Sequence, residues 1–171
     1  MKGEKIMNLE KLVKEYQDGC DSCFDAIYKE TLPLVRAAIL NYITERETVL
    51  DLIQDTYLVF IEKRNSYSAK SFQNWIYTIA KNKALDYLKK KKEILLDDDS
   101  NLHDESISPC IRFVLNHLDE DKREVFLLKV LVGYSTKKVS LYLNIDINEV
   151  NKLYYEAKEI LRKELKDYEI R

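Results

Sequence analysis

Hydrophobic side chains recur at three- and four-residue steps along the first ninety residues, which is the spacing of helices packed on a common core. The first predicted helix carries this pattern at Leu9, Leu12, Val13 and Tyr16. A second helix is expected to begin near Asp21 or Ser22, because either side chain can cap the free amide groups of a helix start. Pro33 fits the first turn of a helix and not its interior, so we predict a break at residues 31–32 and a new helix after it.

Two further helices are predicted in this half of the chain. One spans about residues 48–63 and has its apolar face at Val49, Ile53, Tyr57 and Phe60. Acidic and amide side chains occupy another side of the same helix, at Asp51, Gln54, Asp55 and Glu62. The other helix begins after Ser71, which can cap it, and ends in the four lysines of residues 89–92. The first half is therefore predicted to be a helical bundle with one cationic end.

The last sixty residues carry the pattern of a helix-turn-helix. The helix that opens this region is expected to stop at Gly133, the usual residue type at a left-handed helix end. Ser135 can cap a short helix over residues 136–143, and residues 146–149 form a capping box before a long helix that runs to about residue 168. A short helix, a tight turn and a longer amphipathic helix are typical of this DNA-binding motif, although ordinary helical hairpins share the periodicity.

Composition and charge separate the two helical halves. With 46% hydrophobic residues, three Gly and two Pro, the chain lacks the turn residues that β-sheet proteins need, which favours an all-α fold. Residues 1–92 hold 16 basic and 13 acidic side chains and residues 111–171 hold 12 and 11, whereas residues 93–110 hold six acidic and no basic ones. We therefore predict two small helical domains, 1–92 and 111–171, joined by a flexible acidic linker over 93–110.

Other features of the composition limit the class of protein. No stretch approaches the roughly 20 uninterrupted apolar residues of a membrane span, so we expect a soluble cytoplasmic chain with no membrane insertion. Cys20, Cys23 and Cys110 are an odd number of cysteines in a chain large enough to build a core, so no disulfide framework is expected. Cys20 and Cys23 lack a second close pair, so we interpret them as structural residues and expect no metal, no cofactor and no catalytic residue.

In a helix-turn-helix, the first turns of the second helix enter the major groove, and their outward side chains contact bases and phosphates. The candidates, including the cap of the short helix and a lysine further along the long one, are Ser135, Asn148, Glu149, Asn151, Lys152, Tyr155 and Lys158. The alternative is that these side chains form the solvated face of an ordinary hairpin.

Aromatic, polar and basic residues are interleaved around the fourth predicted helix. Such a surface can stack unpaired bases and follow a phosphate backbone. The candidates for this contact are Tyr67, Ser68, Phe72, Trp75, Asn82, Lys83, Lys89 and Lys90. Two alternatives stay open: Phe72 and Trp75 also suit a core, and lysines at a helix C-terminus also complement the helix dipole.

Two strings of residues carry a resemblance to a known family. Residues 51–57 show an acidic residue, two others, then Gln and an acidic residue before an aromatic. Residues 72–88 form a Trp-led helix with an Ala-x-Asn step and a later Asp. Together with second-half positions such as Gly133, Val139 and Ala157, they resemble the extracytoplasmic-function group of bacterial sigma factors over about residues 20–92 and 111–166.

The resemblance implies a sigma factor, which binds core RNA polymerase, directs it to promoters and helps to melt the DNA. It implies that Asp51, Gln54 and Asp55 contact the coiled coil of the largest polymerase subunit, beta-prime, with the beta subunit as a further contact. The first domain would hold the melted minus-ten promoter element, and the second would bind the minus-thirty-five element as duplex. An anti-sigma factor is a further candidate partner.

The chain departs from the family pattern at several positions. The family usually has Glu at the position of Lys138, Gly at that of Asn144, and Arg near Tyr154 and Tyr155. Because Arg binds guanine and phosphate strongly, Tyr at the last two positions predicts weak DNA binding by the isolated chain. Two other classes fit part of the pattern, namely a stand-alone helix-turn-helix regulator and a helical protein-interaction adaptor.

Overall fold

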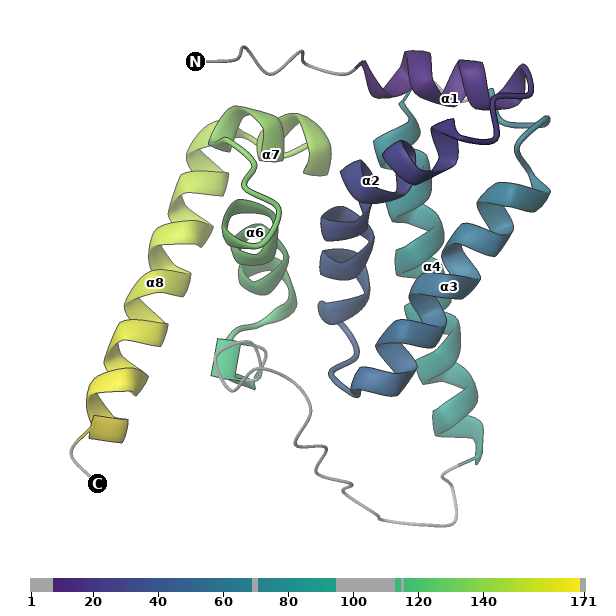
Figure 1. Cartoon of the computed structure of the whole chain (residues 1–171). Coiled ribbons are helices and arrows are strands. Elements are labelled where there is room, and N and C mark those ends of the chain that lie inside the picture. The colour runs from purple at the N-terminus through teal and green to yellow at the C-terminus, as the bar shows by residue number, and fades with distance from the viewer. Residues whose placement is uncertain (1–7, 69–70, 95–112, 115, 170–171) are drawn as a thin grey trace.

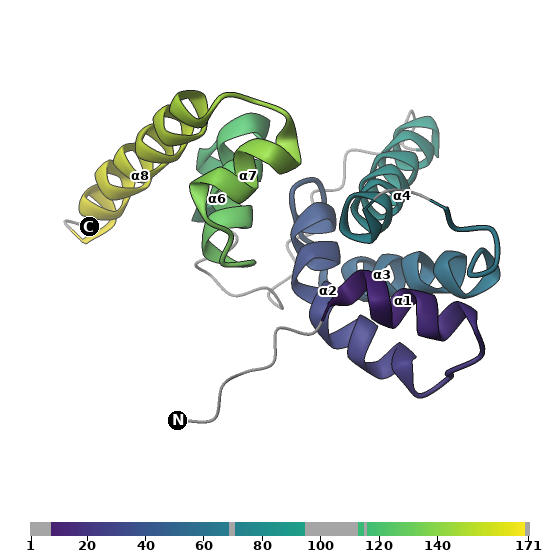
Figure 2. The same cartoon turned by 90° about the horizontal axis from the view of Figure 1, so that it is seen from above.

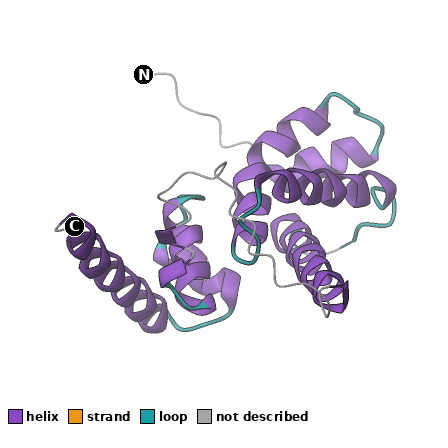
Figure 3. Ribbon diagram, turned by 90° about the horizontal axis from the view of Figure 1, so that it is seen from below, coloured by secondary structure: helices purple, strands orange, loops and turns teal. Residues whose placement is uncertain are grey.

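A computed structural model describes residues 8–68, 71–94, 113–114 and 116–169, and every regular element in these ranges is a helix (Figure 3). The first half forms α1 (Leu9–Gln17), α2 (Cys23–Leu40), α3 (Arg46–Glu62) and α4 (Phe72–Ile94). The second half forms α6 (Glu120–Val130), α7 (Thr136–Leu143) and α8 (Ile147–Glu169). The predicted all-α fold with two helical modules is confirmed (Figure 1). Of the predicted linker, residues 93–94 continue α4 and the rest lies outside the described residues.

Capping side chains define where several helices begin. Ser71 Oγ accepts a hydrogen bond of 3.3 Å from the backbone N–H of Asn74, as the sequence predicted. Ser135 Oγ accepts one of 3.2 Å from Lys138, so α7 has its predicted cap and its predicted bounds. Ser22 precedes α2 as expected but makes no side-chain capping bond. The turn before α2 is instead closed by backbone hydrogen bonds.

Pro33 lies inside α2, so the predicted break at residues 31–32 is wrong. Pro33 and Lys29, whose carbonyl loses its usual donor, both lie on the exposed side of the helix, where water can hydrate that carbonyl. On the opposite side, the Thr31 hydroxyl donates to the Ile27 carbonyl at 2.7 Å and lies 2.9 Å from the Tyr57 hydroxyl. Buried packing on one face thus keeps α2 continuous across the proline.

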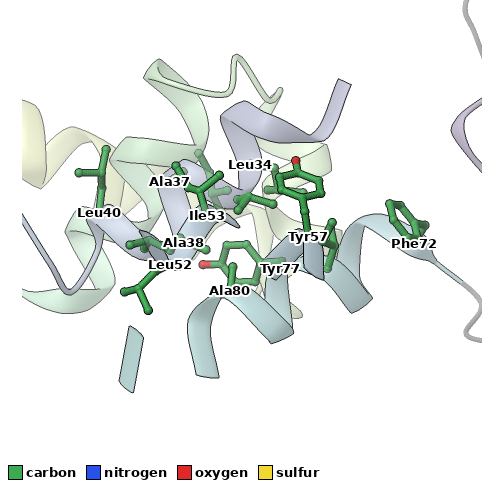
Figure 4. Packing of buried hydrophobic residues seen from close by; sticks show 14 of the residues in the cluster. Leu34, Ala37, Ala38, Leu40, Leu52, Ile53, Tyr57, Phe72, Tyr77 and Ala80 are labelled. Atoms are coloured by element: carbon green, nitrogen blue, oxygen red, sulfur yellow. The ribbon is translucent and has the colours of Figure 1, made fainter. Parts of the chain in front are cut away.

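The core of the first module is formed by side chains of its four helices. Ile27 and Leu34 of α2 and Phe60 of α3 are almost completely buried, as are Phe72 and Ile76 of α4. Figure 4 shows α2, α3 and α4 side chains converging on this interior. The core fixes the orientation of α3 and α4, the two helices that carry the candidate contact residues of this half.

The second module has the predicted helix-turn-helix geometry. Asn144, between α7 and α8, adopts a left-handed conformation with φ of 55°. Glycine tolerates this conformation best and asparagine is among the few other residues that adopt it readily, so Asn144 can replace the glycine usual at this turn. Asp146 then accepts a 2.7 Å hydrogen bond from the N–H of Asn148, and Val150 and Ala157 are fully buried, as the sequence predicted.

The two modules pack against each other, with α6 beside α2 (Figures 1 and 2). A guanidinium N–H of Arg123 in α6 donates to the carbonyl of Asn41, the residue after α2, at 2.7 Å. The Tyr142 hydroxyl of α7 donates to the carbonyl of Gln73 in α4 at 3.1 Å. In addition to these hydrogen bonds, buried apolar residues of both modules belong to one continuous cluster.

Candidate nucleic-acid and protein interfaces

The acidic face predicted on α3 is exposed. The side chains of Asp51, Gln54 and Asp55 all lie at the surface, at positions that share one side of the helix. Gln54 also lines a groove of about 360 Å³ between α2 and α3, together with Leu32, Arg36, Arg46 and Leu50. Leu50 is 48% exposed, so the acidic face borders an apolar surface. Charges beside exposed apolar side chains are the composition of a protein-binding surface.

Three aromatic side chains, Tyr67, Phe72 and Trp75, pack together between the end of α3 and the start of α4, and we call their surface side the aromatic edge. The ring centroid of Trp75 lies 5.0 Å from that of Tyr67 and 5.7 Å from that of Phe72. Trp75 and Tyr67 are half-buried, and Ser68 is exposed. Phe72 is completely buried, so its assignment to a nucleic-acid contact is wrong: its ring packs edge-on against Phe60 in the core. Tyr67, Ser68 and Trp75 are the members of this group that reach the surface.

Three side chains that sequence reasoning missed hold the α3–α4 loop in place. The Gln17 amide donates to the carbonyls of Arg64 at 2.6 Å and Tyr67 at 3.0 Å. The Glu10 carboxylate accepts from the N–H of Phe72 at 2.7 Å and from the Tyr67 hydroxyl at 3.3 Å. Asp21 pairs with Arg64 at 3.0 Å. These contacts span more than forty residues of sequence, so no local pattern could reveal them.

Polar and basic candidates continue along α4. Asn82, Lys89 and Lys90 are exposed, whereas Lys83 forms an ion pair of 3.6 Å with Asp55 of α3. The pair joins a cation predicted to contact DNA to a carboxylate predicted to contact protein. The exposed lysines at the end of α4 extend a cationic edge beyond the aromatic group.

The predicted recognition surface lies on the first turns of α8. Asn148, Lys152, Tyr155 and Lys158 are exposed, and Asn151 is half-buried. Ser135 is exposed on the neighbouring α7. Glu149 is half-buried, and its carboxylate lies 3.5 Å from the Lys152 ammonium. Six of the seven residues predicted for this surface therefore lie on α8 and the seventh, Ser135, is the N-cap of α7, and five of the seven are exposed.

Tyr154 is flanked by two cations. The ammonium groups of Lys129 and Lys158 lie 4.9 Å and 5.6 Å from the centre of its ring. The next residue, Tyr155, is 63% exposed and contributes no charge of its own. Lysines on α6 and α8 thus supply positive charge beside a position where arginine is usual, although without the bidentate geometry of a guanidinium.

A polar seam joins α4 to α6. The hydroxyl of Tyr77 donates to the carboxylate of Glu124, whose Oε1 also lies 3.7 Å from the ammonium of Lys81. Tyr42 donates to Glu120 at 2.5 Å on the same seam. Burial, reinforced by the Glu124 carboxylate, raises the pKa of Tyr77 far above its usual value, so this hydroxyl keeps its proton. The seam holds the second module against the first.

Beside the seam, a cleft of about 500 Å³ opens between the modules, lined by residues of both. Asn74 and Thr78 of α4 face it from one side, and Glu149 and Leu153 of α8 face it from the other. The start of α8 therefore points partly toward the first module. Glu149 lies at the edge of this cleft, where its carboxylate is 3.5 Å from the Lys152 ammonium.

The cysteines differ from expectation. A disulfide joins Cys20 and Cys23, with their Cα atoms 5.5 Å apart, because the turn before α2 brings positions three residues apart within bonding range. The sequence analysis predicted no disulfide framework, and it did not predict this single local bond. No cluster of metal-ligating side chains occurs among the described residues. In the same part of the chain, no helix is long and apolar enough to cross a membrane.

A helical module with an exposed acidic face and an aromatic edge, followed by a helix-turn-helix, defines a two-module DNA-binding protein. Sigma-70 region 2 matches residues 27–94, and Sigma-70 region 4 matches residues 108–161. The sigma factors SigM and SigW of Bacillus subtilis, both of the extracytoplasmic-function (ECF) group, are 24% identical over 150 residues and 25% identical over 187 aligned positions. These alignments cover 81% and 94% of this chain, and 92% and 98% of those proteins.

Two solved structures share the fold. CnrH, in complex with the cytosolic domain of CnrY, aligns with a TM-score of 0.64 at 22% identity, covering 92% of this chain and 96% of that one. The sigma factor RpoE from Bartonella quintana, in complex with the anti-sigma factor NepR, aligns with a TM-score of 0.61 at 23% identity, covering 84% and 96%.

The chain belongs to the sigma-70 family, in its extracytoplasmic-function group. It therefore binds core RNA polymerase and directs promoter-specific initiation of transcription. A stand-alone regulator and a protein-interaction adaptor are not favoured, because the region 2 and region 4 matches occur together in one chain.

Proposed function

We propose that the first module, residues 1–92, docks on polymerase through the exposed face of Asp51, Gln54 and Asp55. The beta-prime coiled coil would meet the acidic face and the adjoining apolar groove. The charge of this face supports the assignment, because charge complementarity sets the orientation of a protein contact. The chain acts in the cytoplasm, where polymerase is found, and catalyses no reaction itself.

The same module holds the melted minus-ten element. Tyr67, Ser68 and Trp75 contact unpaired bases, Asn82 hydrogen-bonds to a base edge or sugar, and Lys83, Lys89 and Lys90 attract the phosphates. A base that leaves the stack costs a few kcal/mol, and stacking on a protein ring offsets this cost. The half-buried aromatic edge between α3 and α4 is the observation that carries the proposal.

The second module, residues 111–171, reads the minus-thirty-five element as duplex through the start of α8. Lys152 and Lys158 contact phosphates, while Asn148, Asn151 and Tyr155 face base edges. The acidic segment 93–110 connects the modules along polymerase toward the beta subunit and the RNA exit path. In the free chain, an anti-sigma factor is a further partner of the same surfaces.

Promoter opening by reconstituted holoenzyme tests the assignment of the aromatic edge. Tyr67→Ala removes a stacking ring, and we expect it to weaken opening by about 1 to 3 kcal/mol, the usual contribution of one base stacked on an aromatic side chain. Asn82→Ala should also open the duplex poorly while still forming the closed complex. Permanganate reactivity of unpaired thymines measures the opening.

Tyr67→Phe is the matched control, because it loses the hydrogen bond to Glu10 but keeps the ring. We expect Tyr67→Phe to open promoters as the wild type does, and a pre-melted bubble to rescue Tyr67→Ala in part. Normal thymine reactivity in Tyr67→Ala and Asn82→Ala on duplex promoter would refute the proposed role of this edge.

A further inference from the structure

The turn between α1 and α2 contains a cysteine pair for which promoter recognition has no evident use. Cys20 and Cys23 are bonded to each other in the structure. Cys23 is buried at the start of α2, whereas Cys20 is only partly buried. Thiol–disulfide exchange begins at the more accessible cysteine of such a pair, which here is Cys20.

Both sulfurs also have polar neighbours suited to the reduced form. Cys20 Sγ lies 3.5 Å from the Ser22 hydroxyl, which can donate a hydrogen bond to a thiolate. Cys23 Sγ lies 3.8 Å from a carboxylate oxygen of Glu15, which can accept one from a thiol. After reduction, each sulfur would therefore have a hydrogen-bond partner within the turn.

One residue before the pair and one residue within it hold the α3–α4 loop. Gln17, three residues before Cys20, donates to the carbonyls of Arg64 and Tyr67, and Asp21, between the cysteines, pairs with Arg64 at 3.0 Å. A cross-link across residues 20–23 reduces the freedom of Asp21 directly and restrains the end of α1 through the turn. The state of the two sulfurs is thus connected to the position of Tyr67.

We propose that Cys20 and Cys23 form a reversible thiol–disulfide site, which a low-molecular-weight disulfide oxidises and whose oxidation fixes the α3–α4 loop. The Cys20 thiolate attacks one sulfur of the small disulfide, the S–S bond breaks, and one small thiolate leaves. The Cys23 thiolate then attacks Cys20 Sγ, which releases the second small thiolate. The protein loses two electrons and two protons, and the small disulfide is reduced to two thiols. A dithiol reverses both steps.

In the oxidised form, Gln17 and Asp21 keep Tyr67 packed against Trp75. In the reduced form, the turn moves more freely and the loop is less ordered. The consequence for promoter opening rests on the proposed function of Tyr67, whereas the exchange reaction and its effect on the loop do not.

The first measurement follows the chemistry in the full chain carrying Cys110→Ser, which leaves only the pair. The protein is reduced with dithiothreitol, exposed to oxidised glutathione, alkylated and weighed by mass spectrometry. We expect both alkylation sites to be lost together, with no glutathione left on the protein. Persistence of both alkylated thiols, or of a stable glutathione adduct, would overturn the proposal.

The second measurement reports on the loop through Trp75, the only tryptophan of the chain. We expect acrylamide to quench Trp75 fluorescence less in the oxidised form than in the reduced form. Cys20→Ser, which retains the buried Cys23, should stay at the reduced value under either treatment. Gln17→Ala removes the hydrogen bonds from α1 to the loop, so we expect Trp75 quenching to be high in both the oxidised and the reduced form. Lys14→Ala, on the exposed side of α1, is the control and should behave as the wild type.

Equal quenching of the oxidised and reduced wild-type chains, with helix content unchanged, would show that the sulfurs do not control the loop. Because neither measurement contains polymerase or DNA, its result is independent of whether Tyr67 takes part in promoter opening.

Discussion

The ammonium of Lys83 lies 3.6 Å from Oδ2 of Asp55, and this ion pair joins α4 to the exposed acidic face of α3. Both side chains are partly solvated, and such pairs contribute about 0 to 1 kcal/mol, so either partner can be exchanged at small cost. A polymerase cation that takes Asp55 would leave Lys83 free for a phosphate. Through this ion pair, binding of polymerase at Asp55 would make Lys83 of the proposed DNA-binding surface available.

Charge reversal on α3 tests the protein-binding surface. We expect Asp51→Arg to weaken binding to core polymerase, because a reversed charge opposes the complementary surface of the partner. Asp55→Arg should weaken it as well, and it also places two cations together by facing Lys83. Affinity titration with labelled core polymerase measures the effect, and Asp25→Arg, an exposed change on α2, is the control. Wild-type affinity in Asp51→Arg would contradict the assignment.

Two substitutions on α8 should impair promoter binding in different ways. We expect Lys152→Ala to weaken holoenzyme binding at all promoters and to reduce its salt dependence, because a phosphate contact is lost. Asn151→Ala should cost about 1 to 3 kcal/mol only at particular base pairs. Footprints and salt titrations on promoter variants separate the two effects. If neither variant differs from wild type, α8 does not read the DNA as proposed.

The seam between the modules should control how the free chain binds DNA. Tyr77→Phe deprives the half-buried Glu124 carboxylate of its hydroxyl donor, a loss of about 1 to 3 kcal/mol. We expect the modules to separate more often, which raises the radius of gyration in X-ray scattering and strengthens DNA binding without polymerase. Tyr87→Phe is the control, because its hydroxyl contacts Thr48 within the first module. Equal scattering from both variants would argue against the seam.

The turn of the helix-turn-helix gives a prediction about stability. Asn144 has φ of 55°, where a Cβ atom is strained unless the side chain compensates. We expect Asn144→Ala to lower the free energy of unfolding by about 1 kcal/mol, whereas Asn144→Gly should leave it nearly unchanged. Urea denaturation followed by circular dichroism measures both values. Equal stability of the two variants would show that the left-handed turn is not under strain.

Much of the fold was predictable because local rules determined it. The bounds of α7 follow from a cap at Ser135 and a turn at Asn144, and both are visible in the sequence. The same rules failed at Pro33, where packing around Thr31 outweighs the local preference for a break. They also gave Phe72 an external role, since periodicity does not distinguish a ring in the core from one at its edge.

The contacts between distant segments could not be predicted in this way. Gln17 reaches Tyr67 across fifty residues, and Tyr77 reaches Glu124 across forty-seven. No sequence pattern around Gln17 indicates which distant residue it contacts. Tyr77 lies in a helix rich in aromatic residues, where a contact with DNA is an equally consistent interpretation. The exposed candidates on α3 and α8 were accessible to sequence reasoning because their own helix determines which way they face.

The joint between α2 and α6 contains polar atoms that lack partners. Arg123 donates to the carbonyls of Asn41 and Leu118, but among the described residues neither its Nε nor the Asn41 side-chain amide has a hydrogen-bond partner. The guanidinium of Arg123 thus joins the end of α2 to the segment before α6 through two backbone carbonyls. Because one side chain makes both contacts, Arg123→Ala would remove the hydrogen bond to Asn41 and the one to Leu118 together, so the position of α6 against α2 depends on a single residue.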